Sequence, residues 1–109
     1  IPFFHGERST GYDEDARGAI IGLTAADDGI DVLRAAMEGV AFRLADIYER
    51  LATVAEVKTI VASGGALRES PVWTQIIADV LGRDLTLSDA RESSSRGAVL
   101  LALESIGKM

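Results

Sequence analysis

Residues 59–73, TIVASGGALRESPVW, decide the fold of this 109-residue chain. They begin inside a β-branched, apolar run, residues 56–62, which is typical of a buried strand. Two consecutive glycines, Gly64 and Gly65, stop this run, and a Ser-Pro pair follows a few residues later. Serine is a common helix N-cap, and proline is favoured at the first helical position. The stretch therefore predicts a strand, a tight turn and a new helix.

Upstream of this stretch, the sequence predicts one long helix over residues 30–54. Apolar residues recur there at intervals of three and four, which is the repeat of one helix face. Asp28 is the expected N-cap, and Asp31, three residues later, completes a capping-box arrangement. Asp46 and Arg50 are spaced as an i,i+4 ion pair on the more polar side of the helix.

Downstream of the glycines, the sequence predicts two helices and a strand. Ser70 caps the first of these helices, and Gly82 ends its apolar stripe. Residues 83–89 alternate like a short strand, and residues 98–106 are typical of a closing helix. Residues 25–109 therefore have the order helix, strand, helix, strand, helix. This order predicts an α/β layer with parallel or mixed strands.

Residues 1–24 show no helical periodicity, so we expect an extended segment or a hairpin. Within this segment, Glu7 and Arg8 either pair with neighbouring residues or hold the hairpin. Gly39 lies inside the long predicted helix, where glycine costs about 1 kcal/mol relative to alanine. It predicts that another segment packs closely there. The chain does not begin with methionine, and we expect a fragment of a longer protein.

The composition favours one modest core and excludes several classes of partner. The formal net charge is -6, whereas binding to a phosphate backbone relies on clustered lysine and arginine, so we expect no nucleic acid. The longest strongly apolar run, residues 98–103, is far shorter than the roughly 20 residues that span a bilayer, so we expect no membrane. The sequence has no cysteine, which excludes disulfides and thiolate zinc sites. We expect a cytoplasmic protein.

Gly64 and Gly65 form the candidate site. In an α/β sheet, ligands gather at the carboxyl ends of the strands, and both glycines follow the expected strand. Because they have no Cβ, they can take positive φ and let a flat or anionic ligand approach the main chain. A turn that only reverses the chain explains the same residues and is the commoner case. The spacing matches neither G-x-x-x-x-G-K-[ST] nor G-x-G-x-x-G.

Four stretches of the chain together resemble the FGGY family of carbohydrate kinases. Residues 18–38, GAIIGLTAADDGIDVLRAAME, are similar to the C-terminal signature of that family, with Asp31 and Glu38 in its two acidic positions. The other three stretches, in the order of the family, are GERSTGYDEDARG at 6–18, SGGALRESPVWTQIIADVLG at 63–82 and SSSRGAVLLAL at 93–103. Thr10 departs from the family pattern, which often has proline there.

The resemblance implies a partial actin-like (ribonuclease H-like) ATPase domain of the α/β class, the later half of the family's C-terminal domain. It also implies ATP and Mg²⁺ as cofactors. In the family, the Gly-Gly turn lies against the adenosine end of the nucleotide, which assigns that role by position to Gly64, Gly65 and Ala66. Ser70 is a weaker candidate for a nucleotide contact, because a plain helix N-cap explains it at least as well.

By resemblance, the full-length protein phosphorylates a hydroxyl of a sugar or sugar acid, with gluconate favoured and D-xylulose next. The family's catalytic aspartate and phosphate loop belong to the earlier domain. We therefore assign no catalytic residue and no metal ligand to this chain, and we expect the fragment alone to be inactive. The expected partners are ATP and the small substrate, and a homodimer is an open alternative. A non-catalytic actin-like module for nucleotide binding or assembly is the second interpretation.

Overall fold

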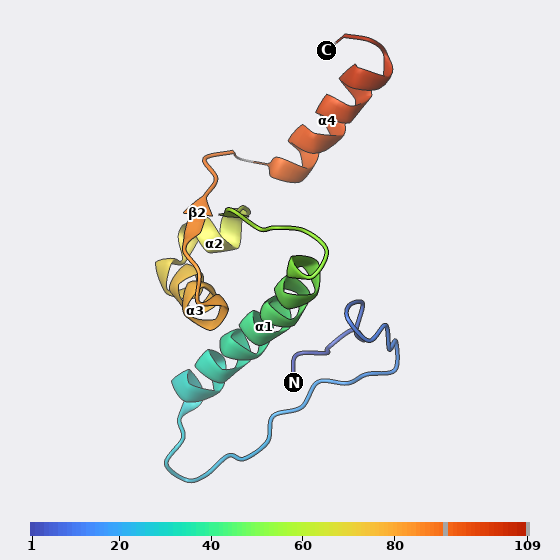
Figure 1. Cartoon of the computed structure of the whole chain (residues 1–109). Coiled ribbons are helices and arrows are strands. Elements are labelled where there is room, and N and C mark those ends of the chain that lie inside the picture. The colour runs from blue at the N-terminus through green and yellow to red at the C-terminus, as the bar shows by residue number, and fades with distance from the viewer. Residues whose placement is uncertain (91, 109) are drawn as a thin grey trace.

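The computed structural model describes residues 1–90 and 92–108 and contains both helices and strands (Figure 1). The elements are α1 (Gly29–Ala52), β1 (Ile60–Ala62), α2 (Gly65–Glu69), α3 (Pro71–Leu81), β2 (Leu85–Leu87) and α4 (Ser93–Ser105). The long elements follow one another in the order expected from the sequence, and the short helix α2 is an addition. None of the helices formed by the described residues is long and apolar enough to cross a membrane.

α1 begins where the sequence predicts, because Asp28 caps it. The Asp28 carboxylate accepts hydrogen bonds from the backbone N of Ile30 (2.7 Å) and Asp31 (3.1 Å), and the Asp31 carboxylate accepts one from the Asp28 N (3.0 Å). These reciprocal bonds satisfy backbone donors that a helix start otherwise leaves free, and they confirm the capping box. Just before the cap, the Thr24 backbone N–H and hydroxyl donate to Asp27, which lowers the pKa of the Asp27 carboxyl.

α3 is bounded by the residues that the sequence predicts. Ser70 Oγ accepts a hydrogen bond from the Trp73 backbone N at 3.2 Å, and Pro71 occupies the first helical position. Gly82 ends the helix in the left-handed conformation, with φ 58° and ψ 30°, which glycine adopts at little cost. The helix packs against α1, and Ile77 is buried.

β1 and β2 form a parallel pair, in which Ile60 lies opposite Leu85 and Ala62 lies opposite Leu87. The strand predicted over residues 56–62 is too long, because only its last three residues pair. A strand extends only where a neighbour accepts and donates its backbone hydrogen bonds. β2 offers three residues, and no other strand lies beside β1 in the described part of the chain.

Arg83 ties the start of this parallel pair to α1. Its Nη1 donates a hydrogen bond to the Tyr48 hydroxyl (2.6 Å), and its Nη2 donates to the carbonyl oxygen of Val57 (3.0 Å). The guanidinium carbon also lies 5.8 Å from the centroid of the Tyr48 ring, within the range of a cation–π contact. Tyr48 belongs to α1, Val57 precedes β1 and Arg83 precedes β2, so one side chain links three elements.

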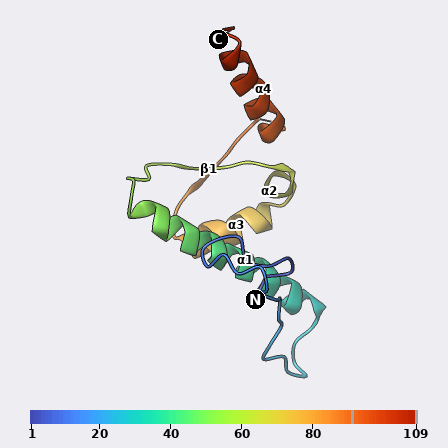
Figure 2. The same cartoon turned by 90° about the vertical axis from the view of Figure 1, so that its right-hand side faces the viewer.

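The packed core is smaller than the composition led us to expect. Among the described residues, the buried apolar side chains are those of Ala41, Ala62 and Ile77. The chain extends over 61 × 31 × 26 Å with a radius of gyration of 17.1 Å, whereas a compact domain of this length has about 13 Å. α4 projects away from the other elements in both views (Figures 1 and 2). Large apolar side chains on the helices, such as Leu33 and Leu101, are consequently exposed.

Residues 1–24 lie beside α1 as an irregular extended segment. The hairpin alternative is not formed, although Ile1 and Ala19 exchange two backbone hydrogen bonds of 2.9 and 3.0 Å. Pro2 lies against α1 at Gly39, where its Cδ is 3.9 Å from the position that a Cβ would occupy. This distance is an ordinary van der Waals contact, so the segment lies beside the helix at Gly39 but does not require a glycine there.

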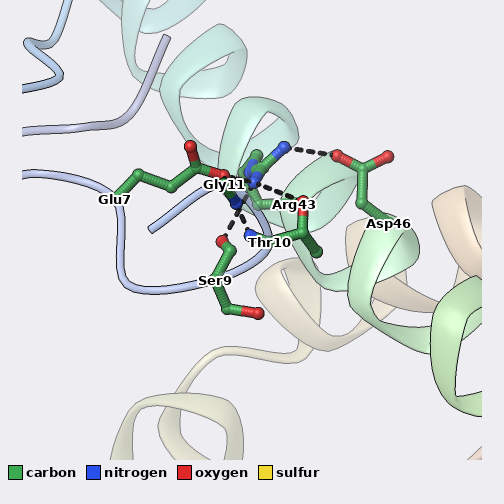
Figure 3. Close-up of polar contacts among 6 residues, drawn as sticks. All are labelled: Glu7, Ser9, Thr10, Gly11, Arg43 and Asp46. Atoms are coloured by element: carbon green, nitrogen blue, oxygen red, sulfur yellow. Dashed lines mark hydrogen bonds and ion pairs between the residues drawn. The ribbon is translucent and has the colours of Figure 1, made fainter. Parts of the chain in front are cut away.

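Glu7 organises the turn that attaches this segment to α1 (Figure 3). Its Oε1 accepts hydrogen bonds from the backbone N of Thr10 and Gly11, both at 2.9 Å, and forms an ion pair with Arg43 of α1. Arg43 Nη2 also donates to the Ser9 carbonyl oxygen at 2.9 Å. A Cβ at position 11 would come too close to the Glu7 carboxylate in this arrangement, so a larger residue there would displace the Glu7 side chain. The structure therefore supports the alternative in which Glu7 holds the N-terminal segment in place, here against α1.

Arg43 completes this attachment from the helix side. Its Nη1 donates to Asp46 Oδ2 at 2.6 Å, and its guanidinium carbon lies 5.0 Å from the centroid of the Phe3 ring. The expected pair between Asp46 and Arg50 is therefore wrong, because Asp46 pairs with the arginine three residues before it. The physical reason is that Glu7 holds the Arg43 guanidinium in place, which leaves Nη1 beside Asp46.

We expect Arg43→Met to destabilise the attachment of the N-terminal segment by about 1–3 kcal/mol, because Glu7 then keeps a partly buried charge without its partner. The Arg43 and Glu7 side chains are 25% and 13% exposed. The measurements are thermal unfolding of the full-length protein and the rate of trypsin cleavage after Arg17, which rises if the segment detaches.

A second pair on the same helix provides the control. Arg34 and Glu38 also form an ion pair, but their side chains are 71% and 36% exposed. An exposed pair at this spacing contributes about 0.3–0.5 kcal/mol, so Arg34→Met should change neither readout much. Equal effects of the two substitutions would contradict the anchoring role of Arg43.

Candidate functional site

Gly64 and Gly65 connect the carboxyl end of β1 to α2. Gly64 has φ 110° and ψ 153°, a region of backbone conformation that is essentially restricted to glycine. Gly65 is the first residue of α2 and, unlike Gly64, does not have a positive φ. Both glycines are exposed, and a Cβ built on either would meet no other atom of the described protein within 4 Å. The main chain at this turn is therefore open to a ligand.

An open hollow of about 260 Å³ borders the turn. Its lining residues come from two segments that are far apart in the sequence: Gly64, Gly65, Arg68, Glu69, Ala90 and Glu92. The first four belong to the turn and α2, and the last two follow β2. Because β1 and β2 are parallel, their carboxyl ends lie at the same edge of the sheet. The pairing of the strands thus creates the hollow.

The predicted site residues divide into two groups. Gly64 and Gly65 line the hollow, whereas Ala66 is exposed on α2 and does not line it. Ser70 does not line it either, because its hydroxyl caps α3 and its backbone N donates to the Ala66 carbonyl oxygen at 3.1 Å. The cap interpretation of Ser70 is confirmed. The adenosine contact inherited by Gly64, Gly65 and Ala66 stays a prediction.

Sequence reasoning missed the other four lining residues for two reasons. Arg68 and Glu69 lie on α2, a helix of five residues that is too short to show an apolar repeat. The available signal for this helix was the composition of residues 66–69, ALRE, because all four are good helix formers. Ala90 and Glu92 approach the turn only through the pairing of β1 with β2. The predicted parallel order implied this meeting, but it did not name the residues.

The charges of the hollow favour a ligand end that carries no charge of its own. Among the described residues that line it, Arg68 supplies one positive charge, and Glu69 and Glu92 supply two negative charges. Carboxylates accept hydrogen bonds from hydroxyl and amino groups but repel phosphates. Together with the open main chain, this donor and acceptor set suits a flat, hydroxyl-bearing molecule better than a polyanion.

The described residues contain no group of three or more His, Asp or Glu side chains that could hold a metal ion.

Comparison with known families decides which proteins the chain is related to. The family model described as "FGGY family of carbohydrate kinases, C-terminal domain" matches residues 1–105. The chain belongs to the FGGY family. The resemblance inferred from the four sequence stretches is thereby confirmed over almost the whole chain.

Individual FGGY kinases are similar over the same range. A gluconokinase of Bacillus subtilis (strain 168) is 34% identical over 110 residues, which covers 99% of this chain and 21% of that relative. A gluconokinase of Bacillus licheniformis has the same identity and coverage. A glycerol kinase of Desulfitobacterium hafniense (strain DSM 10664 / DCB-2) is 33% identical, covering 98% of this chain and 22% of the relative. The chain therefore spans about a fifth of the length of these relatives.

We expect the two glycines of the turn to differ in what the fold requires of them. Gly64→Ala should destabilise the full-length protein by about 1–3 kcal/mol, because alanine is strained at φ 110°. Gly65→Ala should change stability by less than about 0.5 kcal/mol, because its Cβ enters open space at a helical position. Denaturant unfolding measures both. Similar losses at the two positions would show that Gly65 also has a purely structural role.

Proposed function

We propose that this chain is the nucleotide-binding part of an ATP-dependent carbohydrate kinase that phosphorylates a hydroxyl of a sugar or sugar acid. The observation that carries the proposal is the open turn of Gly64 and Gly65, at the carboxyl end of β1, in a domain of a carbohydrate-kinase family. A turn that only reverses the chain needs a glycine at the strained position. It does not need the second glycine, because a Cβ built there meets no atom of another described segment within 4 Å.

Within this proposal, the chain binds and orients ATP but does not carry out the chemical step. The adenosine end lies on the turn, where the absence of side chains at positions 64 and 65 allows close approach to the main chain. ATP supplies the γ-phosphoryl group, which passes to the substrate hydroxyl. Phosphoryl transfer depends on a positioned nucleophile and on charge stabilisation around that group. We assign neither task to residues of this chain, and Mg²⁺ enters the proposal through the family alone.

Gluconate is the favoured substrate, with D-xylulose next. Relatives named gluconokinase reach 34% identity, and relatives named glycerol kinase lie between 29% and 33%. This difference supports gluconate over glycerol but is small, and the sugar contacts expected for the family lie in its earlier domain. A cytoplasmic location, where ATP and sugar acids meet, belongs to the same proposal.

A substrate panel with the full-length protein tests the proposed activity. We expect ADP release to depend on gluconate, with a lower rate on D-xylulose and none without a sugar. The 109-residue fragment should release no ADP with any substrate, because the base and phosphate loops of the family lie in the earlier domain. A full-length protein that binds ATP but phosphorylates none of the panel would favour the assembly module instead. Sugar-dependent ADP release by the fragment would contradict the proposed division of roles.

Gly65→Val tests the nucleotide contact itself. The added side chain enters the hollow, so the KM for ATP should rise about 5- to 150-fold, which corresponds to the 1–3 kcal/mol cost of overpacking. The KM for the sugar should not change. Gly29→Val is the matched control, because Gly29 is also the first residue of a helix and also has no atom within 4 Å of a built Cβ. Equal ATP KM values for both variants would remove Gly65 from the nucleotide site.

A further inference from the structure

We propose that Arg68 is a nucleotide-contacting residue whose guanidinium lies against the purine base, and not against the phosphates. The proposal rests on the proposed function, because it names a further residue of the same nucleotide site. Arg68 lines the hollow beside Gly64 and Gly65. None of the motifs in the sequence assigned a role to it.

The position of Arg68 on α2 brings it to the open side of the turn. It is three residues after Gly65, and residues at this spacing share one face of a helix. Its backbone N donates to the Gly64 carbonyl oxygen at 3.3 Å, so the two residues are joined across a single helical turn. A flat ligand on the exposed backbone of Gly65 therefore comes within reach of the arginine side chain.

Arg68 differs in its bonding from the other two partly buried arginines of the described residues, Arg43 and Arg83. Arg43 and Arg83 are partly buried, and both form several hydrogen bonds to side chains or carbonyl oxygens. Arg68 is partly buried too, yet its guanidinium has no hydrogen bond, ion pair or ring contact within the described part of the chain. The guanidinium nitrogens keep contact with solvent at the hollow, so they are accessible to a ligand that binds from outside.

The surrounding charges decide which end of a nucleotide this partner is. Glu69 and Glu92 line the same hollow, so a triphosphate beside Arg68 would also face two carboxylates. A purine base carries no charge and offers a flat aromatic face, on which a planar guanidinium stacks well. The same carboxylates can then accept hydrogen bonds from ribose hydroxyls or an exocyclic amine.

Binding measurements on the full-length protein separate these two contacts. The ligands are ATP, adenosine and inorganic triphosphate, each titrated by calorimetry into wild type, Arg68→Gln and Arg68→Lys. We expect Arg68→Gln to weaken ATP and adenosine by the same factor, about 3- to 30-fold, and to leave triphosphate unchanged. Arg68→Lys should restore little of the loss, because lysine keeps the charge but lacks the planar group.

Kinetics and a control variant complete the test. Arg68→Gln should raise the KM for ATP by the same factor, with kcat, the KM for the sugar and the unfolding midpoint unchanged. Arg50→Gln, which removes an exposed arginine from α1, should alter none of these values. Weaker ATP binding with unchanged adenosine binding would overturn the base contact, as would full rescue by lysine or no effect at all. If wild type binds neither ATP nor adenosine, the proposed function itself fails.

Discussion

The parallel pairing of β1 with β2 is the constraint on which the candidate site depends. Three residue pairs hold the strands together, and a backbone bond from Ser88 N to the Ala62 carbonyl oxygen, 2.9 Å long, extends the pairing to the edge of the sheet. Because the strands run in the same direction, the segments that follow them meet at that edge. This meeting is what lets Gly64 and Glu92 line the same hollow. A shift in register would move the two halves of the hollow apart.

Two arginines attach neighbouring segments to α1 and add to the packing of the helices. α3 packs against α1, but the buried apolar side chains among the described residues are only those of Ala41, Ala62 and Ile77. Arg83 joins α1 to the start of both strands, and Arg43 joins α1 to the N-terminal segment. Arginine suits this task because its planar group presents several donors in a fixed geometry. The edge that carries the glycine turn is thus connected to α1 through the strand pair and Arg83.

The features that the sequence predicted correctly depend on residues a few positions apart in the chain. The features that it missed depend on residues far apart in the chain. The caps at Asp28, Ser70 and Gly82 involve bonds within a few positions, so residue type and spacing were sufficient. The partner of Asp46 was mispredicted because Glu7, far away in the sequence, fixes the position of Arg43. The strand over 56–62 was predicted too long because its length depends on a distant segment, β2. A β-branched composition favours a strand but does not show how many residues its partner strand can pair.

The site residues follow the same rule, and their charges bear on how a nucleotide lies. Gly64 and Gly65 were predicted because their effect is local to the backbone. Arg68 and Glu92 were missed because their place beside the turn depends on the other residues that line the hollow. Among the described residues that line the hollow, two carboxylates outnumber one guanidinium, which disfavours a phosphate there. Under the proposed function, the triphosphate extends away from this edge, and the charge of the transferring phosphoryl group is stabilised by residues outside the hollow. This chain then contributes affinity and orientation for the nucleoside, which are the tasks that an open backbone and a planar cation can perform.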